Sequence, residues 1–298
     1  MSGYPLLPKM RAVLLCLVCL GCMSAVASET VDWYVWPIPG VVNVEHGEPT
    51  DGLAMEVLAQ VLEHLPMSAR FHLGNRARLQ QDMAQGVSLC SLPLLPEARS
   101  DAIGYFIPLF ASTPIQVVVR QSQLAEFPIA QGQLSLADLL ADPALRGGLA
   151  KARTYPAKLQ QQIEEGVRQG RIQRIATAMS GDNLLLMLAH GRFDFALEYA
   201  SIIQALRSRQ SSGEPLVSVP IREDRELSSI GIYCTRNAWG RQLALQLDAA
   251  IRQAFADPAR VLALHAKWLP AESYQVYLGD FEAFYRQRAQ RPLELLPD

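Results

Sequence analysis

Along the first third of the chain, apolar residues alternate between strand-like and helical spacing. Thr30 to Trp36 is rich in β-branched and aromatic residues, which is typical of a strand. The run ends at Pro37-Ile38-Pro39, because two prolines this close cannot continue a β-ladder. From Gly52 to Pro66 the apolar residues share one face of a helix. The next segments predict a strand, a polar helix and a buried strand: Ala69 to Leu73, Arg76 to Gln85 and Val87 to Leu95.

The same alternation continues through the rest of the chain. Ile115 to Arg120 predicts a strand that leaves the first set of elements, and a second set of short strands and helices spans about residues 121 to 220. Ser228 to Cys234 predicts a strand that returns to the first set. An amphipathic helix follows, and Asp257-Pro258 starts what we expect to be the last helix. Strands that alternate with helices indicate mostly parallel sheets and therefore an α/β fold.

The two ends of the chain differ from its middle. Lys9 and Arg11 precede an apolar run, and Ala25-Val26-Ala27 supplies the small residues that a signal peptidase reads. We therefore predict a signal peptide over residues 1–27 and a periplasmic location. A lipid anchor at Cys22 is the alternative, since this cysteine follows an imperfect lipoprotein-type site. The charged tail from Gln287 onward is expected to fray.

Composition narrows the class of protein. Of the 298 residues 50% are hydrophobic and 19% charged, which is enough to bury a sizeable core and argues against disorder. Without residues 1–27 the chain carries 25 basic and 29 acidic residues, a net charge of −4, because Lys9 and Arg11 are the only charged residues removed from the 27 basic and 29 acidic ones. The arginines are scattered, so we expect no nucleic-acid partner.

Motifs for catalysis or metal binding are missing from the sequence. The histidines show no metal-ligand spacing, and no HExxH, Gly-x-Ser-x-Gly, P-loop or GxGxxG pattern occurs. We therefore predict no catalytic residues, no metal site and no cofactor.

Two cysteines remain outside the signal peptide, Cys90 and Cys234. In an oxidising compartment a pair of cysteines suggests one disulfide, which would stabilise the fold by roughly 4–5 kcal/mol in the chain-entropy model. Two separate buried thiols are the alternative.

Five short motifs, weak alone and moderately specific in their order, resemble the bacterial periplasmic solute-binding proteins of the polar amino-acid-binding type (family 3-like). The motifs are Gly52-Leu53, Arg99 with Tyr105 and Pro108, Leu136-Ala137-Asp138-Leu139, Gly191 to Ala196, and Cys234 to Gly240. The resemblance implies a type II fold of two lobes, each a mostly parallel sheet flanked by helices. Two crossing strands would join the lobes, near Val117 to Gln121 and near Leu227 to Tyr233. The implied lobes are residues 28–120 with 221–298, and residues 121–220, with a ligand trapped between them by hinge closure.

The family's amino-acid clamp is only partly present. The family implies an arginine that follows a threonine three positions earlier; Arg99 matches the arginine, but Pro96 stands at the threonine position and offers neither a hydroxyl nor an N–H group. The family's amine-binding aspartate, counted from Asp194, corresponds to Tyr199, with Glu198 beside it. The sequence thus resembles the scaffold without the α-amino-acid clamp.

A candidate cleft lining follows from the resemblance and from strand ends. Open α/β sheets bind ligands at the carboxyl ends of strands, which favours Trp36, although core packing is its alternative. Arg153 to Tyr155 lie where a strand passes into a helix, a position that favours an anion. The predicted ligand-binding residues are Trp36, Arg99, Tyr105, Arg153, Thr154, Tyr155, Glu198 and Tyr199. Two arginines with aromatic residues and a carboxylate suit a small polar ligand, anionic or zwitterionic.

Three functions stay open at this point. The first is a monomeric solute-binding protein that serves a membrane transporter of the ABC type or a sensor. The second is a dehydratase-like enzyme on the same scaffold, with Glu198 as acid or base and Arg99 as anion anchor. The third is an envelope interaction protein that binds no small ligand, which an exposed apolar patch in place of a cleft would favour.

Overall fold

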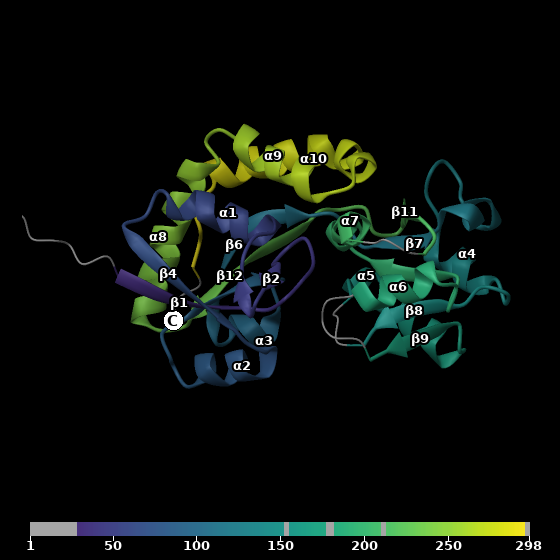
Figure 1. Cartoon of the computed structure of the whole chain (residues 1–298). Helices are drawn as coiled ribbons and strands as arrows, with labels where there is room; N and C mark the ends of the chain where they lie inside the picture. The colour runs from purple at the N-terminus through teal and green to yellow at the C-terminus, as the bar shows by residue number, and fades with distance from the viewer. Residues whose placement is uncertain (1–28, 152–154, 177–181, 210–212, 296–298) are drawn as a thin grey trace, which may run out of the picture.

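The computed structural model describes residues 29–295 except 152–154, 177–181 and 210–212, and it contains two five-stranded sheets. Figure 1 shows the sheets as two separate bodies, each with its own helices. We call them the first and the second lobe. This arrangement confirms the predicted α/β fold with two sheet-and-helix lobes. The predicted signal peptide lies outside the described residues.

The first sheet has the strand order β4-β1-β5-β12-β6. β1 runs parallel to both β4 and β5, whereas β12 is antiparallel to β5 and β6, so the sheet is mixed. Its strands are β1 (Glu29–Val35), β4 (Met67–Leu73), β5 (Cys90–Leu94), β6 (Gly104–Ser112) and β12 (Ser228–Thr235). A small antiparallel ribbon, β2 (Val44–Glu45) with β3 (Glu48–Pro49), follows β1.

The second sheet has the order β11-β7-β10-β8-β9 and is also mixed. β8 is parallel to β9 and β10, while β7 is antiparallel to β10 and β11. Its strands are β7 (Gln116–Arg120), β8 (Gly147–Ala150), β9 (Ile172–Ile175), β10 (Phe195–Glu198) and β11 (Leu216–Pro220). β7 thus belongs to the second lobe, although the predicted boundary at residue 120 assigned it to the first.

Helices cover both faces of the sheets. In the first lobe α1 (Leu53–Leu62) and α8 (Ala238–Ala254) cover one face, and α2 (Arg76–Ala84) covers the other, where Leu79 and Met83 join a cluster around Trp36. A short helix, α3 (Ala98–Asp101), precedes β6. The second lobe carries η1 (Gln121–Glu126), α4 (Leu136–Ala141), α5 (Ala157–Arg168), α6 (Asp182–Ala189) and α7 (Ala200–Arg209).

The C-terminus differs from the sequence-based expectation. α9 (Ala259–Trp268) is not the last helix, because Pro270 is followed by the 20-residue helix α10 (Ala271–Gln290). Tyr277, Phe281 and Tyr285 are spaced by four and are buried, so one face of α10 belongs to the core of the first lobe. The prediction of fraying from Gln287 is therefore wrong for the end of this helix, where Arg288 is buried.

Cys90 and Cys234 form a disulfide, which confirms the predicted pairing. The two residues lie opposite each other on the antiparallel strands β5 and β12. The bond therefore joins β5, which precedes the excursion into the second lobe, to β12, the strand that returns from it.

Each lobe has its own apolar core. The largest cluster fills the space between the first sheet and helices α1, α8, α9 and α10, and two further clusters lie on the faces of the second sheet. Among the described helices, none combines the length and the apolar composition that a bilayer span requires.

Candidate functional site

The segments that follow the carboxyl ends of β1 in the first lobe and β10 in the second lobe lie in contact. The loop after β1 reaches the start of α7, which follows β10 directly. A Cβ atom at Gly40 would lie 2.5 Å from the carbonyl oxygen of Ser201 and 3.3 Å from the Cβ of Ala205. Ile38 packs against apolar clusters of both lobes. We call this contact between residues 38–40 and residues 201–205 the interlobe junction.

Two segments connect the lobes beside this junction. Residues 113–115 link β6 to β7, and residues 221–227 link β11 to β12. They lie a few residues before the crossing strands expected from the sequence. Gln116 is the first residue of β7 and pairs in register with Glu198 of β10 and Pro220 of β11. It therefore lies at the end of the second sheet from which the two connections run. Sequence reasoning missed Gln116, although a polar residue inside the apolar run from Ile115 was a usable signal.

Arg99 lies exposed on α3, at the carboxyl end of β5. The main chain around it is held by Tyr233, whose hydroxyl accepts a hydrogen bond from the Glu97 N–H at 3.0 Å and donates to Asp101 at 2.5 Å. Burial, and then the hydrogen bond to Asp101, raises the pKa of the Tyr233 hydroxyl, so it keeps its proton for that bond. Arg76 pairs with Glu97 and ties α2 to the same turn.

The predicted aromatic residues of the first lobe face its interior. Trp36 is 6% exposed and packs with Leu79 and Met83. Tyr105 is 2% exposed, and the guanidinium of Arg236 lies 4.5 Å from the centre of its ring. In this arrangement their large surfaces contribute to the core, and a ligand contact by either residue stays a prediction.

Of the predicted ligand-binding residues in the second lobe, the structure describes Tyr155, Glu198 and Tyr199. The Tyr155 hydroxyl accepts a hydrogen bond at 3.1 Å from the N–H of Ala150, the last residue of β8, and the ring is buried. Arg153 and Thr154 lie outside the described residues. Glu198 is fully buried at the carboxyl end of β10, and its Oε1 accepts from the Tyr199 N–H at 2.8 Å.

The structure therefore brings together part of the predicted set. Glu198 and Tyr199 directly precede the helix that forms the interlobe junction, and Trp36 directly precedes the loop that meets it. Arg99 lies on the first lobe at the end of a strand of the same sheet. Their roles in ligand binding stay predictions. Gly40 was missed because the close approach that requires a glycine involves a segment distant in the sequence.

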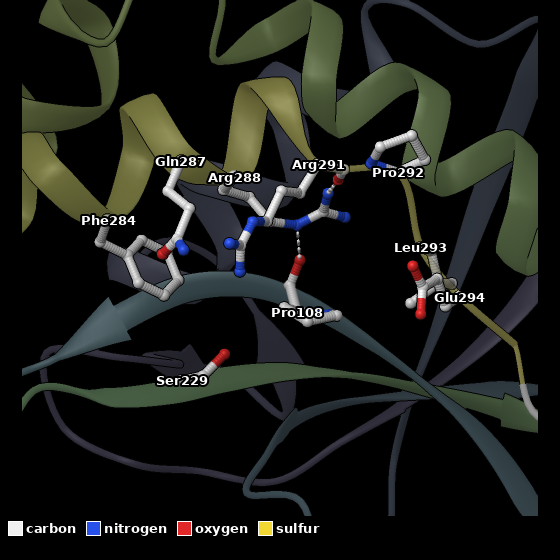
Figure 2. A pocket seen from close by; sticks show the side chains of 9 residues that line it. All are labelled: Pro108, Ser229, Phe284, Gln287, Arg288, Arg291, Pro292, Leu293 and Glu294. Atoms are coloured by element: carbon white, nitrogen blue, oxygen red, sulfur yellow. Dashed lines mark hydrogen bonds between the residues drawn. The ribbon is translucent and has the colours of Figure 1, made fainter.

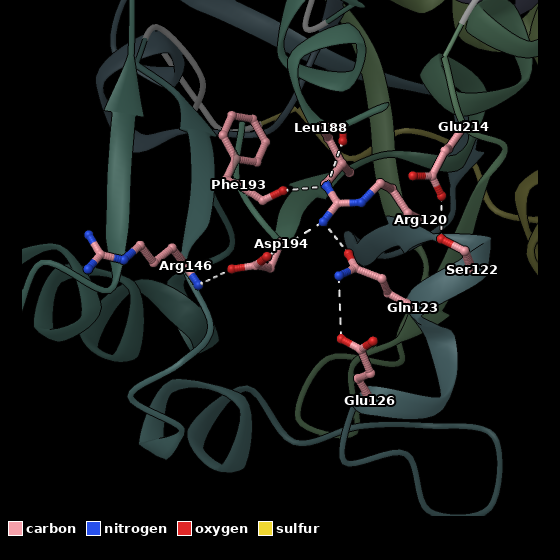
Figure 3. A network of polar contacts seen from close by, with 9 residues as sticks. All are labelled: Arg120, Ser122, Gln123, Glu126, Arg146, Leu188, Phe193, Asp194 and Glu214. Atoms are coloured by element: carbon pink, nitrogen blue, oxygen red, sulfur yellow. Dashed lines mark hydrogen bonds and ion pairs between the residues drawn. The ribbon is translucent and has the colours of Figure 1, made fainter. Parts of the chain in front are cut away.

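A polar network around Arg120 organises the end of β7, as Figure 3 shows. This guanidinium is buried and donates to the carbonyl oxygens of Leu188 at 2.8 Å and Phe193 at 2.7 Å. It also lies 3.5 Å from the carboxylate of Asp194, which accepts from the Arg146 N–H at 2.9 Å. All of these partners belong to the second lobe. The network therefore fixes strand ends inside one lobe, and it explains Asp194 without a ligand.

Two cavities lie along α10. One, of about 570 Å³, opens between the end of α10 and the strands β6 and β12, and Figure 2 shows Arg288 and Arg291 in its wall. The other, of about 680 Å³, lies between α10 and residues 225–227. Neither is lined by a predicted ligand-binding residue. Within the part of the chain that the structure describes, no group of His, Cys, Asp and Glu side chains is placed to hold a metal ion.

Comparison with solved structures identifies the fold as the type II periplasmic-binding-protein fold. The sequence itself matches no family model and no curated relative. The probable amino-acid ABC transporter extracellular-binding protein of Bacillus subtilis matches with a TM-score of 0.62 at 15% identity, over 81% of this chain and 98% of that one. A Streptococcus mutans structure described for glutathione import through GshT and a cystine ABC importer matches with 0.63 at 12% identity, over 82% and 98%. A histidine kinase sensor domain similar to periplasmic binding proteins matches with 0.59 at 18% identity, over 81% and 96%.

Proposed function

We propose that this protein is an extracytoplasmic solute-binding protein that holds a small polar solute at the interlobe junction. The observation that carries the proposal is the contact of Gly40 with Ser201, because it brings together the segments that follow β1 and β10, one strand of each sheet, beside the two connecting segments. In an open α/β sheet the carboxyl ends of strands are where ligands bind. A junction of this kind lets a solute bridge the two lobes, and bending of the two connections would close them around it.

The solute class follows from the available groups and from the matched folds. Arg99, exposed on α3, would anchor an anionic group, and Glu198 with Tyr199 would face it from the second lobe. Several structures with this fold are described as amino-acid or cystine binding or import proteins, which supports an amino-acid-like solute. Pro96 takes the place of the clamp's threonine, so we expect a solute other than a free standard α-amino acid.

The partner would be a membrane component that recognises the loaded lobes. An ABC transporter and a sensor kinase are both consistent, because both kinds of protein occur among the matched structures. The proposed location outside the cytoplasm rests on the predicted signal peptide and on the disulfide, which persists in oxidising compartments.

The direct test is a thermal-shift screen with amino acids, their amides, dipeptides, amines, organic acids and phosphonates, combined with mass spectrometry of small molecules that co-purify. A true solute at 100 times its dissociation constant stabilises the protein by about 2.7 kcal/mol. Arg99→Ala and Glu198→Gln should remove that shift, whereas Glu165→Gln, at a partly exposed position of α5 in the second lobe, should keep it. No shift with any compound and no co-purified molecule would rule the proposal out.

A dehydratase-like activity is the second candidate. The observation in its favour is a buried carboxylate, Glu198, at the carboxyl end of a strand, and one matched structure is described as an amino-acid-binding precursor of cyclohexadienyl dehydratase. The matched structures named above are binding proteins or a sensor domain, and we rank the enzyme below them. Turnover of a bound solute that disappears in Glu198→Gln while binding persists would support it, and binding without turnover would exclude it.

A further inference from the structure

The C-terminal helix α10 runs across the connection between the lobes (Figure 1). The matched structures cover 81–82% of this chain but 96–98% of their own lengths. About a fifth of this chain therefore has no counterpart in those structures. The contacts of α10 show what this helix can do.

The C-terminal half of α10 is anchored to the first lobe. The Tyr285 hydroxyl accepts a hydrogen bond from the Ala111 N–H of β6 at 3.3 Å. The Arg288 Nε–H donates to the Pro108 carbonyl oxygen at 2.9 Å, and the same guanidinium lies 2.6 Å from the buried carboxylate of Asp248 on α8. These contacts are buried, so this half of α10 moves with the first lobe.

The middle of α10 lies beside both connecting segments. Tyr277 is 3% exposed, and its hydroxyl shares a hydrogen bond with the side chain of Gln116, where the first connection enters β7. Residues 225–227 of the second connection line one cavity together with Asp280 and Phe284 of α10. A bend of the first connection would therefore displace Gln116 from Tyr277.

The N-terminal turn of α10 reaches the second lobe. The Glu272 carboxylate lies 2.8 Å from the guanidinium of Arg207, near the end of α7. Arg207 is itself tied to the second sheet, because it donates to the Leu216 carbonyl oxygen of β11 at 2.9 Å. The ion pair thus links an element anchored on the first lobe to one anchored on the second.

The structure assigns to α10 the role of a brace that restricts rotation of the lobes about their two connections. α7 is held at its start by the junction with Gly40 and near its end by the pair of Arg207 with Glu272. A rotation that opens or closes the lobes must move α7 relative to the first lobe, and it would break the ion pair or drag Tyr277 from Gln116. This proposal concerns the unliganded protein and does not depend on the proposed solute binding.

The strength of the brace sets the size of the expected effect. Arg207 and Glu272 are both partly exposed, 32% and 53%, so their pair belongs to the weak class of surface ion pairs. Loss of such a pair changes the ratio of two lobe orientations by about two- to fivefold, which is measurable in a distance distribution but small in a melting curve.

The test measures the distance between the lobes. Reporter groups are attached through non-natural amino acids at Gln81 on α2 and Gln173 on β9, two exposed positions on different lobes, so that no cysteine is involved. The distance distribution is recorded by pulsed electron paramagnetic resonance or single-molecule fluorescence for the parent and for Glu272→Arg, Arg207→Glu and the double exchange. Tyr277→Phe, which removes only the hydroxyl, is measured in the same way.

We expect each single charge reversal to broaden or shift the distribution. The double exchange should restore it in part, because opposite charges again face each other although residue 207 no longer donates to the Leu216 carbonyl oxygen. Tyr277→Phe should broaden it as well. The matched control is the pair Glu63 with Arg260, which has similar exposure but lies wholly in the first lobe, so Glu63→Arg should leave the distribution unchanged. A chain that ends at Pro270 is not a test, because it would expose the core that Tyr277, Phe281 and Tyr285 cover.

Two results would overturn the brace. One is a distribution in Glu272→Arg as narrow as in the parent and centred at the same distance. The other is a Glu63→Arg distribution as broad as that of Glu272→Arg, which would show that a charge reversal outside the proposed brace has the same effect. Neither result changes the outcome expected in the solute-binding screen, so the brace can be refuted while the proposed function stands, and the reverse.

Discussion

At the scale of single residues, Gly40 shows how one position can serve the contact between the lobes. It has a positive φ of 75°, and its missing side chain makes room for the Ser201 carbonyl. Both features favour glycine, the first through backbone conformation and the second through space.

Gly132→Ala separates these two effects. Gly132 has a nearly identical φ of 74°, but a Cβ there would meet nothing within 4 Å. Alanine at Gly132 should lower the free energy of unfolding by about 1–2 kcal/mol through backbone strain alone. Gly40→Ala should cost clearly more, because the new Cβ also collides with Ser201, and denaturant unfolding of both variants measures the difference. Equal losses of unfolding free energy in the two variants would mean that the segments of the interlobe junction move apart at little cost.

His265 should make the protein acid-sensitive. Its ring is fully buried, stacks 4.1 Å from the ring of Phe281, and has Nε2 2.6 Å from the Tyr285 hydroxyl. Burial raises the pKa of Tyr285 and lowers the pKa of His265 to about 3, so the hydroxyl stays protonated and donates to a neutral imidazole.

The folded pKa of His265 lies below the ordinary value of 6.5, so the unfolded chain binds the proton first as the pH falls. Above pH 6.5 the residue carries no penalty. Between pH 6.5 and about 3 it should remove up to about 1.4 kcal/mol of unfolding free energy per pH unit. In His265→Phe the free energy of unfolding should fall less steeply with pH by that amount, as measured by urea unfolding at several pH values. A slope equal to that of the parent would contradict this prediction.

Residue roles were the least predictable part of the site. The sequence placed Trp36 at the end of a strand correctly, but whether its ring enters the core or a cleft depends on α2, which packs on that face. The role of Arg120 was equally hard to predict from the sequence. It is buried at 5% exposure and fixes strand ends through hydrogen bonds to segments that are distant in the sequence.

At the scale of elements, sequence reasoning missed the helix α10, and it also missed β6, α7 and β11. The buried positions of α10, Tyr277, Phe281 and Tyr285, follow a helical spacing that was readable, but the many charges between them suggested a fraying tail. Other elements before residue 256 were predicted where strong apolar periodicity and flanking prolines and glycines mark them, as for β1, α1 and α8.

The buried ion pair that fixes α10 to α8 should be sensitive to loss of one partner. Asp248 is 3% exposed and lies between Arg288, at 2.6 Å, and Arg252, at 3.1 Å. Asp248→Asn leaves the Arg288 charge buried without its counter-ion and should cost about 3–5 kcal/mol. Glu63→Gln, which breaks an exposed pair, should cost less than about 1 kcal/mol, and denaturant unfolding compares the two. Similar small losses in both would mean that water reaches the Arg288 charge.

At the scale of the whole molecule, the order of elements and the two-lobe architecture were predictable from the sequence. The alternation of strands and helices implied two α/β bodies, and the short motifs suggested how they connect. The identity of the ligand was not predictable from the sequence. The groups that would define it lie at the ends of strands from both lobes, and the orientation of their side chains depends on the packing between the lobes.

The disulfide should be a large single contribution to the stability of the whole chain. Cys90 and Cys234 are separated by 144 residues, so their bond removes much of the freedom of the unfolded chain. The double variant Cys90→Ala/Cys234→Ala should lose about 2–5 kcal/mol of unfolding free energy. Alkylation of the unreduced, denatured protein should modify neither cysteine, and modification of both would refute the bond.

One pairing in the first sheet has a consequence for how this molecule could be taken apart. Ser112, the last residue of β6, faces Ser228, the first residue of β12, across an antiparallel ladder. The chain therefore leaves and re-enters the first sheet at neighbouring points, like the two ends of a hairpin whose turn has been replaced by an entire lobe. Replacing residues 113–227 with a two-residue Asn-Gly turn would close that hairpin, and the disulfide lies on the retained strands. The first lobe would then be a scaffold of its own, into which a different domain could be inserted at the same point.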